Sequence, residues 1–225
     1  MTLNETTLFP LVLTLLTYQI GVAVKKKWNY QVLNPILISA VLVICILFLL
    51  GYPLEAYDEG CKNFSWLLTP ATVCFAVPLY EQLRILRKHL PWIIAGIVAG
   101  VVSSLLCIYG LCRVLAMEDV LLYSLLPKSI TTAMGIVVSA QLGGIPALTT
   151  AAIIITGILG ACMGTGLCKI LRIKHPIAQG VAFGTASHVM GTSRATEISE
   201  LTGAVSSLAL VIAGILTSAL CTAFV

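Results

Sequence analysis

Three basic side chains lie inside strongly apolar stretches of this 225-residue chain: Lys128, His188 and Arg194. An ionisable group at the centre of a bilayer costs about 3 kcal/mol or more, so such residues are functional candidates by default. Hydroxyl groups surround them and could replace the hydration shell of a small anion such as a carboxylate, without a metal. The candidate binding residues are Thr72, Lys128, Ser129, Thr131, Thr132, Thr185, Ser187, His188, Thr192 and Arg194.

Each of these cations also has a purely structural interpretation. Arg194 could pair with Glu197, three residues further on, near the membrane surface. Lys128 could extend its ammonium group to the membrane interface. His188 could be a neutral residue hydrogen-bonded between helices, or it could carry protons and couple them to transport.

The composition indicates what kind of protein must position these residues. Hydrophobic residues make up 59% of the chain and charged residues only 10%, with a mean hydropathy of +1.03. A soluble protein of this size needs a charged exterior, whereas a protein surrounded by lipid does not. The net charge of +4 is small and gathers in clusters, which indicates membrane topology and not nucleic-acid binding.

Helical spans account for most of the sequence, because about 20 apolar residues cross the hydrocarbon as a helix. Three further stretches are apolar but interrupted by proline, glycine and polar residues, which is tolerated only where protein or a water-filled cavity satisfies the backbone. We predict helix breaks at Pro70, Pro78, Pro127, Gly184 and Gly191. The uninterrupted spans are residues 6–24, 35–50, 92–115, 146–168 and 201–225, and the interrupted ones are residues 64–80, 120–142 and 177–197.

Basic clusters at residues 25–27, 84–88 and 169–174 predict the cytoplasmic side. With the amino terminus outside, counting crossings then requires residues 120–142 to return to the side they entered, as a re-entrant segment or as an unequal pair of segments. The alternative is a weak basic signal that helix packing overrides. Pairs of glycines four residues apart, Gly96 with Gly100 and Gly160 with Gly164, predict close helix packing.

The order of elements indicates an internal duplication. Residues 64–80 followed by 92–115 are echoed by residues 177–197 followed by 201–225. Matching interrupted segments in two halves are typical of inverted-repeat transporters. We therefore expect an all-α, polytopic membrane protein of about seven to eight segments with discontinuous or re-entrant helices. It would form one integral membrane domain over residues 1–225, with possible repeat halves at about 1–115 and 118–225.

Enzyme signatures are poor. The sequence has no phosphate-binding glycine loop with its lysine, no His-Glu-x-x-His and no Gly-x-Ser-x-Gly. His188 follows Ser187, but neighbours in sequence do not make a nucleophile and its base. We expect no enzyme, no metal and no cofactor.

Four strings together are specific enough to identify a family resemblance: TPATVCFAVPLYEQL (69–83), LPKSITTAMG (126–135), QLGGIPALTTAAIIITGILGA (141–161) and GVAFGTASHVMGTSRATE (180–197). They resemble the LrgB/CidB family of bacterial membrane proteins, which includes the chloroplast glycolate and glycerate translocator. The match runs over nearly the whole chain.

The resemblance implies two functions. The first is a transporter of small monocarboxylates of the pyruvate, lactate, glycolate and glycerate class. The alternative is an antiholin-like regulator of murein hydrolase export, cell lysis and programmed cell death. Both imply a multi-pass protein of the bacterial cell membrane with an LrgA/CidA-like, holin-like partner. We also expect a homo-oligomer, as a dimer, and no nucleic-acid partner.

Overall fold

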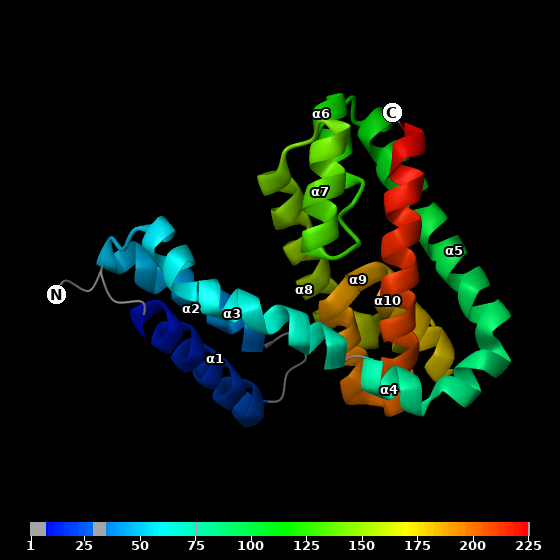
Figure 1. Ribbon diagram of the computed structural model, residues 1–225, viewed down its shortest axis with the longest axis horizontal. Helices are drawn as coiled ribbons and strands as arrows, with labels where there is room; N and C mark the ends of the chain where they lie inside the picture. Colours follow the sequence, from blue (N-terminus) through cyan, green and yellow to red (C-terminus); the bar gives the residue numbers. More distant parts are fainter. Residues whose placement is uncertain (1–7, 29–34, 75, 225) are drawn as a thin grey trace. The chain divides into compact units, whose positions relative to one another are not determined.

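The computed structural model describes residues 8–28, 35–74 and 76–224, with the backbone alone described for residues 63, 65, 68, 69, 71, 72, 76, 78, 79 and 224. Every regular element in these ranges is a helix. The elements are α1 (Leu8–Trp28), α2 (Pro35–Leu50), α3 (Leu54–Cys74), α4 (Ala76–Glu81), α5 (Leu83–Val114), α6 (Asp119–Leu125), α7 (Thr132–Leu142), α8 (Pro146–Ile170), α9 (Pro176–Ile198), α10 (Glu200–Cys221) and the short 3₁₀ helix η2 (Thr222–Phe224). They are drawn in Figure 1.

Four of the described helices are long and apolar enough to cross a membrane: α1, α5, α8 and α10. They correspond to four of the five uninterrupted spans predicted from the sequence. The fifth, α2, is apolar but only 16 residues long. The chain is therefore a helical membrane protein with several spans.

Contacts within the chain divide it into two units, residues 1–74 and 75–225. In the first unit, polar side chains join the helices. The Thr17 and Ser39 hydroxyls lie 2.9 Å apart between α1 and α2, and the Thr14 and Tyr57 hydroxyls lie 2.8 Å apart between α1 and α3. Such bonds between apolar helices contribute about 0.6 kcal/mol each in a membrane.

The α3 helix corrects one sequence prediction. It runs without interruption through Pro70, which removes one backbone donor without ending the helix. Pro70 is therefore not a break. The acidic residues near position 58 lie in the first turns of the same helix.

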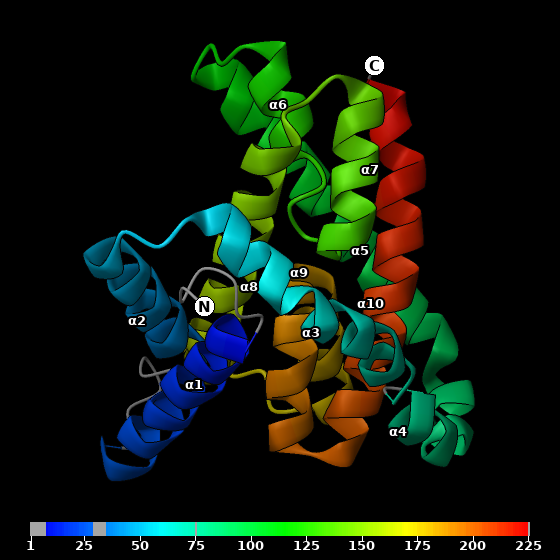
Figure 2. The same cartoon turned by 60° about the vertical axis from the view of Figure 1, so that its left-hand side comes forward.

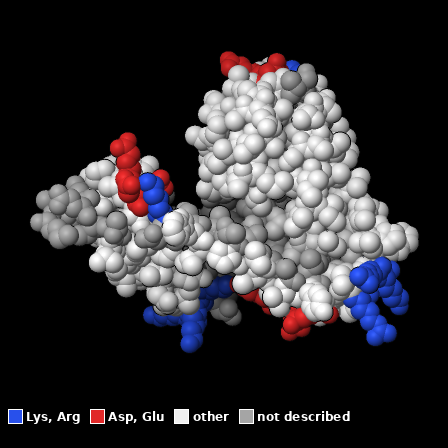
Figure 3. Space-filling model, viewed as in Figure 1, with Lys and Arg blue, Asp and Glu red and all other residues white. Residues whose placement is uncertain are grey.

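The second unit is built around three long helices, and its core follows one stripe of α5. Ile93, Ile97 and Val101 lie one helical turn apart on this stripe and are almost fully buried. They belong to one cluster with buried residues of α10 such as Val205 and Ala209. The face of α5 that carries this stripe therefore packs against the other helices of the unit. Figure 3 shows charged side chains gathered at the two ends of this unit, with an uncharged band between them.

A first hairpin is formed by residues 119–142. After α6 the chain leaves helical structure, turns through residues 126–131 and returns as α7. Its two ends lie together, because Ile145 N donates to Ser124 Oγ over 2.7 Å and Thr149 Oγ1 donates to the Ser124 carbonyl over 2.9 Å. Gly143, at φ +84°, ends α7 in the left-handed conformation that glycine favours. The segment therefore enters and leaves the second unit at the same end.

A second hairpin is formed by α9 itself. Its helix is broken at Ser187 and His188, where the backbone leaves helical geometry. Both arms pack against α10: a Cβ added to Gly180 would lie 2.7 Å from the Thr202 carbonyl oxygen, and one added to Gly203 would lie 2.6 Å from Thr196 Oγ1. Residues 16 positions apart in α9 thus lie beside the same turn of α10. Figures 1 and 2 show this hairpin and the first hairpin approaching each other from opposite ends of α10.

Candidate functional site

The tip of the second hairpin places two polar residues in the interior. Ser187 and His188 are only 3% and 4% exposed. His188 has φ +41° and ψ −135°, a conformation that costs a non-glycine residue about 1–3 kcal/mol. The surrounding helices must hold it in place.

The α8 helix provides that support. His188 Nε2 donates a hydrogen bond to the Ile153 carbonyl over 3.0 Å, which places the ring proton on Nε2 and leaves Nδ1 for another partner. The imidazole lies against Gly157, where an added Cβ would be 2.6 Å from His188 Cε1. At Gly160 an added Cβ would overlap the Ser187 hydroxyl. Two glycines of α8 therefore form the seat of the hairpin tip.

The tip of the first hairpin carries the other polar candidates. Pro127 and Ser129 are buried, whereas Lys128, Thr131 and Thr132 are half-buried. Ser129 Oγ lies 3.4 Å from Ser104 Oγ of α5. Pro127 lies between α6 and α7, so this predicted break is confirmed.

The two tips meet near the middle of α5 and α8. On α5, Ser104 contacts Ser129 of the first hairpin, and Gly100, one turn earlier, faces Thr185 of the second. On α8, Ile153 contacts both hairpins, through its Cδ1 atom near Gly135 and through its carbonyl at His188. Polar residues separated by more than 50 positions in the sequence are thus brought to one level of the unit.

Both tips also present the beginning of a helix. α7 starts at Thr132, and the second arm of α9 starts after His188. The first N–H groups of a helix have no partner within it and carry partial positive charge, which favours anions. Lys128 adds a full positive charge. In the described part of the chain, no salt bridge pairs its ammonium group with a carboxylate, and neither Thr131 nor Thr132 forms a side-chain hydrogen bond.

Comparison with known proteins places the chain in a family. A sequence model described as the LrgB-like family matches residues 14–225. The chain belongs to the LrgB family. It is 34% identical over 210 residues to proteins named antiholin-like protein LrgB from Bacillus mycoides (strain KBAB4) and Bacillus cereus (strain B4264). Each alignment covers 93% of this chain and 91% of the relative. No solved structure matches the chain.

The family resemblance drawn from the sequence motifs is thus confirmed, and several LrgB motif residues meet at the tips. The structure places Lys128, Ser129, Thr131 and Thr132 on the first tip and Thr185, Ser187 and His188 on the second, and contacts with α5 and α8 bring the two tips to one level. The side chains of two other predicted residues, Thr72 and Pro78, lie outside the described residues.

Two predicted residues of the LrgB motif have partners elsewhere. Thr192 donates to the His188 carbonyl over 3.0 Å and lies 2.9 Å from the Ser206 hydroxyl of α10, so it holds the second arm of the hairpin. Arg194 pairs with Glu197, the structural alternative considered from the sequence. Its side chain is 24% exposed, and it lies toward the end of α9, about two turns from the break.

The prediction that Gly184 and Gly191 are helix breaks is wrong. Both glycines are helical, and the break lies between them at Ser187 and His188. An added Cβ at Gly184 would overlap the Ser206 carbonyl of α10, and one at Gly191 would overlap the Phe183 carbonyl of the opposite arm. The glycines therefore permit close packing of backbones and do not provide the turn.

Sequence reasoning missed Ile153, Gly157 and Ser104 as parts of the site. The Ile153 carbonyl could not be predicted as a partner, because every residue type has a backbone carbonyl. The glycine pairs, in contrast, were a usable signal, and the predicted close packing is confirmed. Gly96 and Gly100 of α5 face Val181 and Thr185, whereas Gly160 and Gly164 of α8 face Ser187 and Phe183. Both pairs thus contact the first arm of α9.

Proposed function

We propose that this LrgB-family protein is an antiholin-like regulator that acts on a holin-like LrgA/CidA-type partner in the bacterial cell membrane. The observation that supports it is the 34% identity, over 93% of the chain, to relatives named antiholin-like protein LrgB. In this proposal the protein binds the partner within the bilayer and limits pore formation, and thereby murein hydrolase export, lysis and programmed cell death.

The test is co-expression with the holin-like partner in bacterial cells, with dye entry and lysis as the readouts. The wild-type protein should delay both, and the two proteins should purify together from detergent. Equal dye entry with and without this protein, at matched partner levels, would refute regulation.

A second candidate function is transport of small monocarboxylates of the pyruvate, lactate, glycolate and glycerate class, with protons as a possible coupling ion. The observation that favours it is the meeting of two hairpin tips with Lys128, unbonded threonine hydroxyls and two helix beginnings. These groups match the negative charge and the lone pairs of a carboxylate. No enzyme activity, metal or cofactor is part of this proposal.

Labelled carboxylate uptake into liposomes tests this second function. The Lys128→Met variant keeps the length of the side chain and removes its charge, so uptake should fall by at least tenfold. The matched control is Lys62→Met, an exposed lysine of the first unit that pairs with Glu59. Uptake that is unaffected by Lys128→Met, or equally reduced by both variants, would contradict the assigned site.

An inverted repeat would explain how the transporter exposes its site to the two sides of the membrane in turn. We propose the repeat indicated by the sequence, in which residues 64–80 with 92–115 correspond to residues 177–197 with 201–225, in halves of about 1–115 and 118–225. We also propose about seven to eight membrane segments, one integral membrane domain and assembly as a dimer. Sliding of the tips against α5 and α8 would expose the site to each side in turn.

A further inference from the structure

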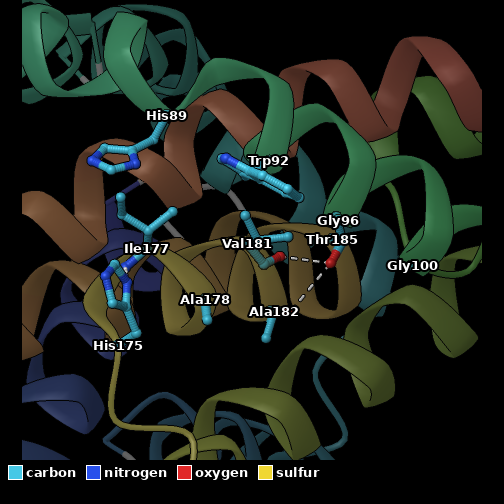
Figure 4. Close-up of a pocket in the computed structure, with 10 residues that line it drawn as sticks. All are labelled: His89, Trp92, Gly96, Gly100, His175, Ile177, Ala178, Val181, Ala182 and Thr185. Carbon is cyan, nitrogen blue, oxygen red and sulfur yellow. Dashed lines mark hydrogen bonds between the residues drawn. The ribbon is translucent and has the colours of Figure 1, made fainter.

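A groove runs along the second unit between the first part of α5 and the first arm of α9. Its volume is about 660 Å³. Figure 4 shows His89 and His175 at one end of the groove and Gly100 and Thr185 at the other. The groove begins at the end of the unit where α5 starts and continues toward the hairpin tips.

The walls of the groove are apolar and smooth. Glycine and alanine form much of them, with Gly96 on α5 and Ala178 and Ala182 on α9. The one hydroxyl at the inner end, that of Thr185, donates to the Val181 carbonyl over 2.6 Å. It therefore offers no free proton to a ligand. Between Trp92 and Thr185 the described lining residues are glycine, alanine, valine and isoleucine, whose side chains offer a carboxylate no donor.

The outer end of the groove is polar and lies next to positive charge. His175 caps α9 through Nδ1, which accepts from Ile177 N over 3.3 Å, so its proton is on Nε2 and is free to donate. The His89 side chain forms no hydrogen bond with any described residue. An exposed lysine precedes each histidine directly, Lys88 before His89 and Lys174 before His175. Figure 3 shows basic side chains at the end of this unit where α5 begins.

The groove thus has two imidazoles at one end, with Lys88 and Lys174 outside its lining, and an apolar body. Its volume is that of a site for a ligand much larger than a two- or three-carbon acid. Basic pockets between membrane helices on the cytoplasmic side bind acidic lipid headgroups, and the basic clusters predict that side here. Trp92 lies along the groove just beyond the histidines. Tryptophan is enriched at the level of the lipid headgroups, so its position is consistent with a headgroup beside the histidines.

We propose that this groove binds an acidic phospholipid. The phosphate is held by His89, His175 and the adjacent lysines, and one acyl chain lies along Gly96, Ala178 and Ala182. The lipid would contact the first arm of α9, which leads directly to the tip at Ser187. The proposal assumes neither regulation nor transport.

Tryptophan quenching tests the proposal, because Trp92 lines the groove. In a variant with Trp28→Phe and Trp66→Phe, Trp92 is the sole tryptophan of the chain. The protein is reconstituted into phosphatidylcholine vesicles that contain a few per cent of brominated phosphatidylglycerol or of brominated phosphatidylcholine. The acidic quencher should be at least threefold more effective at equal mole fraction. Equal quenching by the two lipids would overturn the proposal.

Variants separate the two ends of the groove. Replacing His89, His175, Lys88 and Lys174 by glutamine should remove the preference for the acidic lipid. Ala178→Leu fills the groove and should lower the quenching of Trp92 by the brominated acidic lipid. Ala140 is an exposed alanine of α7, and Ala140→Leu should leave that quenching unchanged. If added glycerol phosphate or pyruvate removes the preference for the acidic lipid, the groove is a site for small anions, and the proposal that it binds a phospholipid is refuted. The comparison of the two lipids in the Trp28→Phe, Trp66→Phe protein decides even if a further variant does not fold.

Discussion

The seat of the second hairpin can be tested with one added methyl group. In Gly160→Ala the new Cβ would occupy the position of the Ser187 hydroxyl and lie 2.5 Å from Ser187 Cβ. Real carbon atoms do not approach so closely, so the hairpin tip must move away from α8. Overpacking of this kind costs about 1–3 kcal/mol.

Gly166→Ala is the matched control on the same helix. No atom lies within 4 Å of the Cβ it would add, and alanine favours helix over glycine by up to about 1 kcal/mol. A change of 1 kcal/mol shifts the melting temperature of a protein of this size by about 2–4 °C. Gly166→Ala should therefore leave the melting temperature in detergent unchanged or raise it, and Gly160→Ala should melt about 2–12 °C below Gly166→Ala.

A double variant tests the cause. Ser187→Gly removes the side chain that the new methyl group meets, so Gly160→Ala with Ser187→Gly should be less destabilised than the sum of the single variants. Equal melting temperatures for Gly160→Ala and Gly166→Ala, or strict additivity in the double variant, would refute the described seating of the hairpin on α8.

Three further outcomes follow from the contacts described. Thr149→Val removes the 2.6 Å bond to Ser139 Oγ and should lower the free energy of unfolding by about 1–3 kcal/mol, with faster amide exchange in the first hairpin as the check. Arg194→Gln removes the pair with Glu197 near the end of α9, and thermal melting should show a loss below about 1 kcal/mol; a larger loss would contradict an interfacial role. Thr17→Val breaks the bond from α1 to α2 and should cost about 0.6 kcal/mol, measured as a small drop in the melting temperature.

The sequence predicted the long helices of the second unit well, because hydrophobic length alone decides them. Proline at the first position of α8 and of α9 also marks where these helices start. The interruption near Ser187 was visible as a cluster of small and polar residues. Its exact position was not, because a histidine adopts a positive φ there and its ring is held by the Ile153 carbonyl and Gly157 of α8, which are distant in the sequence.

The candidate site could be predicted only in part, for a similar reason. Residue type identified Lys128 and His188, since cations in apolar segments stand out. The meeting of the two tips depends on packing between helices that are far apart in the sequence, such as Ser104 with Ser129. Proline was the least informative signal, because the same residue type interrupts the chain at Pro127 and is accommodated within a helix at Pro70.

The lengths of the two hairpins have an electrical consequence. α7 has 11 residues and the first arm of α9 has 11 before Ser187, so each is about 16 Å long. Together they match the hydrocarbon thickness of about 30 Å, with their tips end to end. A membrane potential of 100 mV does about 2.3 kcal/mol of work on one elementary charge that crosses the whole field. An anion held between the tips would sit near the midpoint of that drop, so its occupancy would depend on the voltage across the membrane.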